Sequence, residues 1–141
     1  MGGNITFTMI KPNATGRNLT GEILAIINKA GFKIIAMKML KLSKEQAESF
    51  YAGHKGKSFF EDLIAFMTSG YVVAAVLQKD NAVKEFRKLI GNTNPALAAE
   101  GTIRKLYADS VRCNAVHGSD SDENAIIESD YFFSQIERIE Q

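Results

Sequence analysis

The alternation of apolar and polar residues divides the chain into short strands and amphipathic helices. Alternation over residues 4–10 predicts a strand, which Pro12 ends because proline cannot donate to a strand ladder. An apolar stripe over residues 20–30 predicts a helix that Thr20 caps and that Gly31 terminates.

Later segments continue this pattern. Ser43 followed by Gln46, and Ser58 followed by Glu61, have the spacing of a capping box and predict two helix starts, with the second helix reaching Thr68. The same periodicities predict strands over 32–41, 71–78 and 114–117, and helices that start at Asn81, near Ile103, and at Ser121 or Asp122.

The order of these elements predicts an α+β fold, a ferredoxin-like four-stranded antiparallel sheet with helices packed on it. A small parallel α/β sheet is the alternative. A chain of 141 residues can close one hydrophobic core, so residues 1–141 are expected to form a single domain.

Composition and charge narrow the classes of function. Hydrophobic residues at 45% and charged residues at 23% exclude a disordered chain. A formal net charge of +1 gives no field that would hold nucleic acid or an anionic membrane, so bound phosphates would need a few converging cations. The single cysteine, Cys113, cannot form an internal disulfide, and with no signal peptide or membrane span predicted, the expected location is cytoplasmic.

Two glycine segments approach the P-loop pattern and fail it. Gly16 and Gly21 have the required spacing but are followed by Glu22 and Ile23 in place of lysine and serine or threonine. Gly56-Lys57-Ser58 has the required ending, but its upstream glycine position holds Tyr51. The sequence therefore excludes a P-loop.

The segment with the clearest chemistry is Asn114-Ala115-Val116-His117-Gly118-Ser119-Asp120-Ser121. His117 leaves a short strand and meets a glycine, which permits close approach to the backbone, and then residues that suit a helix start. Imidazole has a reference pKa of about 6.5 and is nucleophilic near neutrality. A lone histidine is more often an ordinary hydrogen-bonded core residue, so the context must decide.

This segment resembles the active-site signature of nucleoside diphosphate kinases, whose histidine is phosphorylated. The resemblance continues in register from the first strand to the last helix. Its other segments are Ile10-Lys11-Pro12, Tyr51 with His54, Gly56-Lys57-Ser58-Phe59-Phe60, Asn81-Ala82-Val83 with Arg87, Gly91-Asn92-Thr93-Asn94-Pro95, and Gly101-Thr102-Ile103-Arg104.

The resemblance implies a two-step transfer of the terminal phosphate of a nucleoside triphosphate to a nucleoside diphosphate. His117 would carry the phosphate between two nucleotides, which gives ping-pong kinetics. It also implies Mg²⁺ as a cofactor, bound mainly through nucleotide phosphates and water with no protein metal cage. The expected assembly is a homo-oligomer built from dimers, a tetramer or a hexamer.

The resemblance also assigns roles to residues around the nucleotide. Lys11, Arg87 and Arg104 would bind phosphate as cations, and Thr93 would add a hydroxyl. Phe59 would stack on the base with Val111 on the other face, which implies broad base specificity. Phe60, beside Phe59, is expected in the core.

Further roles concern the sugar and the histidine. Asn114 would bind the sugar hydroxyl, a task that Lys11 shares, and Tyr51 would lie near the histidine and the phosphate. Glu128 would orient the imidazole, with Ser119 linking the two. The chain departs from the family pattern at four positions, which are Asn13, Ser58, Tyr71 and Tyr107.

Three other functions are weighed against this one. A nucleotide-binding or regulatory module without turnover would use the same fold, but His117, Lys11 and Arg104 together oppose it. A cysteine nucleophile formed by Cys113 and His117 lacks an accompanying acyl-transfer motif. An RNA-binding module is opposed by the near-neutral charge and by the missing aromatic signature, so no specific nucleic acid is expected as a partner.

Overall fold

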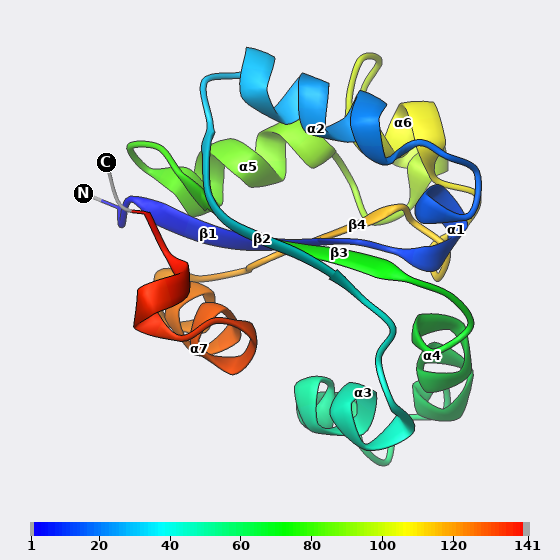
Figure 1. Cartoon of the computed structure of the whole chain (residues 1–141). Coiled ribbons are helices and arrows are strands. Elements are labelled where there is room, and N and C mark those ends of the chain that lie inside the picture. Colours follow the sequence, from blue (N-terminus) through cyan, green and yellow to red (C-terminus); the bar gives the residue numbers. More distant parts are fainter. Residues whose placement is uncertain (1, 140–141) are drawn as a thin grey trace.

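The structure, a computed structural model that describes residues 2–139, contains an antiparallel sheet of four strands in the order β2-β3-β1-β4 (Figure 1). This order with antiparallel pairing confirms the ferredoxin-like prediction, and the parallel alternative is wrong. The strands are β1 (Ile5–Ile10), β2 (Lys33–Leu40), β3 (Val72–Gln78) and β4 (Val116–Gly118).

Seven α-helices connect and cover the strands of residues 2–139. Helices α2 and α5 lie on one face of the sheet, and α3, α4 and α7 lie on the other (Figure 1). The helices are α1 (Pro12–Thr15), α2 (Thr20–Lys29), α3 (Lys44–Phe50), α4 (Phe60–Met67), α5 (Ala82–Ile90), α6 (Ile103–Tyr107) and α7 (Asp122–Phe132). Three 3₁₀ turns cover Ala52–His54, Pro95–Leu97 and Gln135–Glu137.

The sequence of strand β3 is a continuous apolar run because both faces of this strand are buried. Val72, Ala74 and Val76 enter the core on the α3, α4 and α7 side, while the alternate residues Val73, Ala75 and Leu77 enter the core under α2 and α5. Successive side chains of a strand point to opposite faces, so a central strand with both faces covered is apolar throughout.

Aromatic contacts help to close both cores. Phe7 of β1 stacks on Phe132 of α7 with ring centroids 5.0 Å apart, and Phe32 meets Phe86 of α5 edge-on at 5.5 Å. Phe60 is buried beside the first pair's core, as predicted. These contacts fix α7 and α5 against the sheet, and both helices border the site described below.

Some helix caps follow the prediction. Ser43 and Gln46 form both hydrogen bonds of a capping box at the start of α3, and Ser121 accepts from the Asn124 amide at the start of α7. Gly31 follows α2 with a φ of +95°, a conformation that glycine adopts without strain.

Three predicted caps are wrong. Helix α4 starts at Phe60, because Ser58 lies inside a turn closed by the Phe60 amide and the Lys57 carbonyl. Thr20 is the first residue of α2 and makes no cap bond, and Asn81 precedes α5 without a side-chain bond at a φ of +54°.

The sequence also did not predict α1, in which Pro12 is the first helical residue. Proline suits that position because its missing N–H would have had no helical partner. Within residues 2–139, no helix is both long and apolar enough to cross a bilayer.

Strand β4 starts two residues later than predicted, because the backbone turns at Ala115. Ala115 has a φ of +74°, and the Val116 amide donates to the Asn114 carbonyl at 2.9 Å across it, which is a γ-turn. After the turn, Gly118 passes so close to α5 that a Cβ there would lie 2.8 Å from Ile90 Cδ1. A larger residue after His117 would therefore have to displace the side chains of Ile90 and Phe86.

Candidate active site

A cavity of about 710 Å³ lies between the end of α3, the start of α4, α5, α6, α7 and β4. Most of the predicted site residues line it: Lys11, Tyr51, Phe59, Arg87, Thr93, Arg104, Val111, His117 and Glu128. The other two, Ser119 and Asn114, are buried and bond to lining residues. The fold thus brings the predicted set together from distant parts of the sequence.

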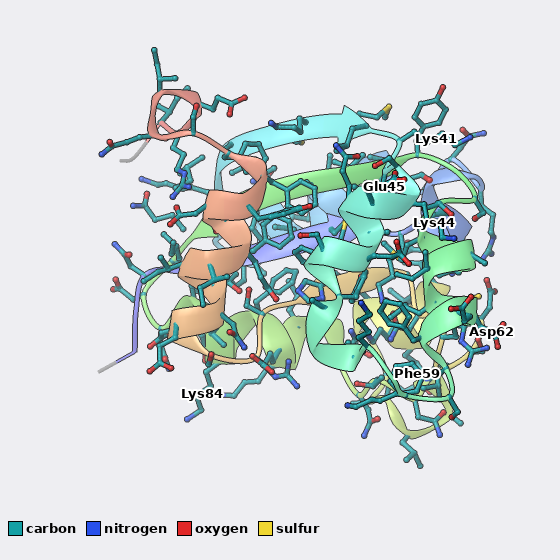
Figure 2. All side chains as sticks on the ribbon, turned by 90° about the horizontal axis from the view of Figure 1, so that it is seen from below. Lys41, Lys44, Glu45, Phe59, Asp62 and Lys84 are labelled. Atoms are coloured by element: carbon teal, nitrogen blue, oxygen red, sulfur yellow. The ribbon has the colours of Figure 1, made fainter. Side chains whose placement is uncertain are left out.

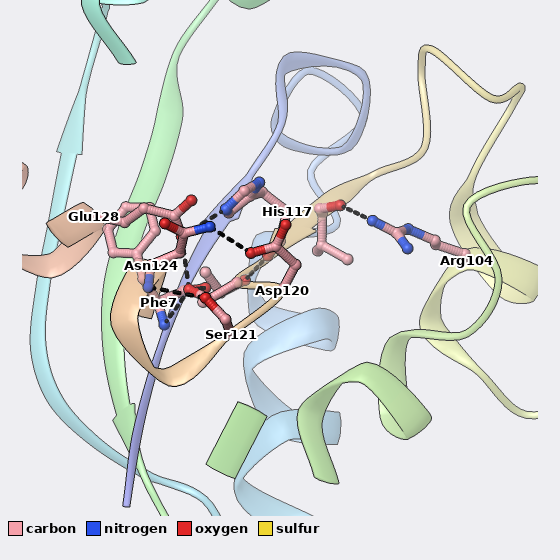
Figure 3. A network of polar contacts seen from close by, with 10 residues as sticks. Phe7, Arg104, His117, Asp120, Ser121, Asn124 and Glu128 are labelled. Atoms are coloured by element: carbon pink, nitrogen blue, oxygen red, sulfur yellow. Dashed lines mark hydrogen bonds and ion pairs between the residues drawn. The ribbon is translucent and has the colours of Figure 1, made fainter. Parts of the chain in front are cut away.

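His117 is held by contacts on several sides. Its carbonyl accepts from Thr8 Oγ1 at 2.8 Å, and its ring packs edge-on against Phe50 and tilted against Phe7, at 5.5 and 6.0 Å between centroids. Its Nε2 lies 2.9 Å from Glu128 Oε1 (Figure 3). An ionised carboxylate only accepts hydrogen bonds, so Nε2 carries the proton and Nδ1 keeps its lone pair.

Ser119 fixes the position of Glu128. Its hydroxyl donates to Glu128 Oε1 at 2.6 Å and accepts from the Phe7 amide at 3.2 Å. Ser119 is completely buried, and the Phe7 amide belongs to the central sheet. The orientation of the imidazole is therefore linked through Glu128 and Ser119 to β1.

Lys11 is a buried amine. Its Nζ donates to Asn114 Oδ1 at 2.8 Å, and its own amide donates to the Ala115 carbonyl, so the γ-turn aligns both partners. Burial, helped by repulsion from Arg104 and opposed in part by Cys113, lowers the pKa of Lys11 to about 7. An anion that enters the cavity would raise this pKa again.

Arg104 of α6 joins two backbone segments. Its Nη2 donates to the Val116 carbonyl at 2.9 Å (Figure 3). Its Nη1 donates to the Gly91 carbonyl at 3.1 Å. Its Nε is buried without a hydrogen-bond partner. Burial, with repulsion from Arg87, lowers the pKa of Arg104 to about 10, so it remains a cation near neutrality.

Five further predicted residues line the cavity. Arg87 on α5 and Thr93 in the following loop are exposed and line the side near Arg104. Phe59 precedes α4, and Val111 lies in the loop between α6 and β4. The hydroxyl of Tyr51 is buried without a hydrogen-bond partner, and burial followed by the charge of Glu128 raises its pKa.

Several residues in the cavity had no predicted role. His54 lines it, and burial, followed by the electrostatic effects of Lys57 and the neighbouring His117, lowers its pKa, while Asp120 opposes the shift. Asp120 also lines it and accepts from Asn124 Nδ2 at 2.6 Å (Figure 3). The spacing of four residues across the start of α7 is the signal that could have indicated this pair.

Arg112 was also missed, and Cys113 lies elsewhere. Arg112 lines the cavity, whereas Cys113 is not among the described residues that do, which removes the basis for a Cys113–His117 nucleophile. Within residues 2–139, no group of three or more His, Cys, Asp and Glu side chains could hold a metal ion.

Comparison with known proteins gives one consistent result. The family described as Nucleoside diphosphate kinase matches residues 4–138. A nucleoside diphosphate kinase of Azorhizobium caulinodans is 58% identical over 132 residues, which cover 94% of each chain. One of Nitratidesulfovibrio vulgaris is 54% identical over 132 residues, covering 94% of this chain and 95% of the relative.

Solved structures agree. The nucleoside diphosphate kinase of Aquifex aeolicus superimposes with a TM-score of 0.94 at 38% identity, over 96% of this chain and 99% of that one. The Halobacterium salinarum enzyme, solved in complex with CDP, gives 0.91 at 35% identity, over 97% of this chain and 91% of that one. With this match in sequence and fold, the chain belongs to the nucleoside diphosphate kinase family and is a phosphotransferase that acts on nucleoside di- and triphosphates.

Proposed function

We propose that the phosphate passes through His117, as a phosphohistidine formed at Nδ1. The observation that carries this proposal is the 2.9 Å contact between His117 Nε2 and Glu128, which leaves the Nδ1 lone pair unused. Nδ1 attacks the terminal phosphorus of a nucleoside triphosphate, the N–P bond forms, and the P–O bond to the leaving diphosphate breaks. No proton has to leave the imidazole, because Nε2–H persists and donates to Glu128.

The second step reverses the first with another nucleotide. A nucleoside diphosphate attacks the phosphohistidine, its terminal oxygen bonds to phosphorus, and the N–P electron pair returns to Nδ1. Such transfer depends mainly on positioning and charge stabilisation. Lys11, Arg87 and Arg104 supply positive charge, and Thr93 and the unpartnered Tyr51 hydroxyl supply donors.

Phe59 and Val111 are proposed to hold the base between them, because both are apolar and both line the cavity. Asn114, fixed by Lys11, is proposed to bind the sugar hydroxyl. Residues 1–141 would carry the whole reaction as one domain.

Mg²⁺ is the proposed cofactor. Asp120 is the cavity carboxylate that is not bonded to His117, and one carboxylate fits a hydrated Mg²⁺ better than a dehydrated ion. The phosphates and water would then supply most of the ligands, and the ion would neutralise charge on the phosphate oxygens. No non-catalytic alternative gains support, since the relatives are named as kinases.

The test is to incubate the protein with γ-labelled ATP and Mg²⁺, with His117→Ala as the control. We expect acid-labile, base-stable label on the intact wild-type chain alone. Addition of GDP should remove this label and produce labelled GTP. Turnover without label on the chain would overturn the relay and indicate direct transfer between two bound nucleotides.

A homo-oligomer is also proposed, with strand β2 as the contact between two copies of the chain. β2 is an edge of the sheet, and its Met37 and Met39 side chains are 51% and 63% exposed. The Ile139 amide covers the edge at the Ile35 carbonyl, so the segment from Met37 to Leu40 is the open part. An open, apolar edge favours pairing with the same edge of a second copy.

This contact can be tested by light scattering after size-exclusion chromatography. The double variant Met37→Glu/Met39→Glu should reduce the mass to that of a smaller assembly or a monomer. Ile136→Glu is the matched control, because Ile136 is 92% exposed but lies outside the strand. An unchanged mass for the double variant would exclude β2 as the contact.

A further inference from the structure

Arg112 differs from the other cavity arginines in its place and its partner. Arg87 and Arg104 come from α5 and α6, whereas Arg112 directly follows Val111 in the loop before β4. Its Nη1 lies 3.3 Å from Asp62 Oδ2, in the first turn of α4. Arg112 therefore connects the loop before β4 to the first turn of α4.

The ion pair connects the two sides of the proposed base site. Phe59 and Asp62 lie at the same end of α4 (Figure 2), and Val111 and Arg112 are consecutive residues of the loop before β4. Both Phe59 and Arg112 line the cavity. A base stacked between Phe59 and Val111 would therefore have its edge near the Arg112 guanidinium.

The ion pair between Arg112 and Asp62 leaves the guanidinium able to bind a ligand. The side chains of Arg112 and Asp62 are 43% and 70% exposed, and ion pairs between such exposed groups contribute little to stability. The contact with Asp62 also uses only Nη1, while a guanidinium carries five N–H donors. The remaining donors can serve a ligand while Asp62 holds the guanidinium in place.

We propose that Arg112 reads the edge of the nucleobase and favours 6-oxopurines, which deepens the proposed function and rests on its base site. Guanine presents two acceptors, O6 and N7, that match the planar fork of an arginine. Adenine presents N7 beside an N6 amino donor, which faces the guanidinium with a like dipole. Phe59 and Val111 have no polar group, so stacking alone would not distinguish these bases.

Equilibrium binding of GDP, IDP and ADP, followed by calorimetry, tests this assignment without requiring turnover. We expect GDP and IDP to bind alike and about tenfold more tightly than ADP, the lower part of the range for a bidentate arginine–guanine contact. IDP has O6 and N7 but lacks the 2-amino group, so its agreement with GDP identifies the edge that is read.

Three variants separate the explanations. Arg112→Gln and Arg112→Lys should each bring the GDP-to-ADP preference to within about twofold, because lysine keeps the charge but loses the fork. Asp62→Asn should keep the preference, because its amide oxygen can still accept from Arg112 Nη1 and hold the guanidinium in place. All three substitutions are at exposed positions.

Two results would overturn the proposal. One is equal binding of GDP and ADP to the wild type. The other is an Arg112→Gln variant that weakens all three nucleotides by the same factor, which would make Arg112 a general phosphate cation. Loss of phosphohistidine labelling would leave the binding ratios unchanged, so a failure of the relay and a failure of this assignment give different results.

Discussion

Ser119 Oγ lies 2.6 Å from Glu128 Oε1, the same oxygen that faces His117 Nε2 at 2.9 Å. One carboxylate oxygen therefore receives two donors, and the serine restrains the carboxylate that restrains the imidazole. We therefore expect Glu128 and Ser119 to act as positioning residues, through His117.

The first prediction concerns this chain of contacts. A hydrogen bond to a charged group contributes about 1.5–3 kcal/mol, so Glu128→Ala should lower kcat roughly 10–100-fold and Ser119→Ala should have a smaller effect. Because Ser119 acts through Glu128, the double variant should lose little more than Glu128→Ala alone. Steady-state kinetics of all three variants measure this, and multiplicative losses would show that the two residues act separately.

The second prediction concerns the proton that Lys11 takes up when a nucleotide binds. Lys11 has a pKa of about 7 in the free protein, and a bound phosphate raises it, so binding above pH 7 requires proton uptake. Nucleotide affinity should fall by up to about tenfold per pH unit between the free and bound pKa values. Calorimetry at pH 8 in two buffers of different ionisation enthalpy measures the protons taken up.

Lys11→Arg is the control, because its guanidinium stays charged in both states and should remove most of the uptake. The stability of the fold should change with pH in the opposite direction to the nucleotide affinity. The pKa of Lys11 lies below its ordinary value of 10.5, so between about pH 7 and that value the unfolded chain binds the extra proton. The free protein should therefore gain stability from this group as pH rises through that window.

The third prediction uses the turn that replaced a predicted capping box. The Phe60 amide bonds to the Lys57 carbonyl, and Phe59 has a φ of −88° and a ψ of −3°, which makes Ser58 the second residue of a type I turn. Proline is favoured at this position. Ser58→Pro should stabilise the protein by about 0.4–1 kcal/mol, chiefly by restricting the unfolded chain.

Thermal unfolding of Ser58→Pro beside Ser58→Ala measures the effect. The alanine variant should lie close to the wild type, because the Ser58 side chain makes no cap bond at the start of α4. A lower melting temperature for the proline variant would mean that Lys57, the residue before it, has to leave a non-extended conformation, because proline pushes the preceding residue toward an extended one.

The fourth prediction explains the amide at position 13. Asn13 Nδ2 donates to Asp109 Oδ2 at 3.1 Å and to the Cys113 carbonyl at 2.9 Å, and both partners are acceptors. An aspartate there could not donate and would face a like charge. Asn13→Asp should cost about 1–3 kcal/mol of stability at neutral pH.

Urea unfolding at two pH values measures this cost. It should shrink at low pH, where the carboxylates are protonated, and Asn13→Asp/Asp109→Asn should recover much of the loss by reversing the pair. An equal loss in the double variant would point to the Cys113 carbonyl as the main partner of Asn13.

The parts of the fold that the sequence predicted are those set by local periodicity. The two-sided apolar run of β3 and the Ser43–Gln46 capping box depend on residues close together in the chain, so their patterns identified them. Helix α1 was missed because four residues are too few for a helical period. The γ-turn at Ala115 was missed because a positive φ normally requires glycine or asparagine.

The site shows the same division. His117 and the cations proposed to bind phosphate were predicted from motifs, because the types and order of the residues in a motif are visible in the sequence. The contact between Arg112 and Asp62 spans 50 positions and involves two exposed side chains, so no local pattern indicates it. Burial shifts the pKa of Lys11 only because the fold encloses it, which composition does not reveal.

Arg104 connects β4 to the loop at Gly91 by donating to one backbone carbonyl in each segment. A guanidinium has five N–H groups, and because Nε–H is buried, one hydrogen on each terminal nitrogen remains for an anion after both carbonyls are served. The two backbone carbonyls and a bound anion would therefore use different N–H groups of one side chain. We therefore expect a bound anion to leave both backbone contacts of Arg104 in place, so that β4 would hold His117 in the same position in both proposed half-reactions.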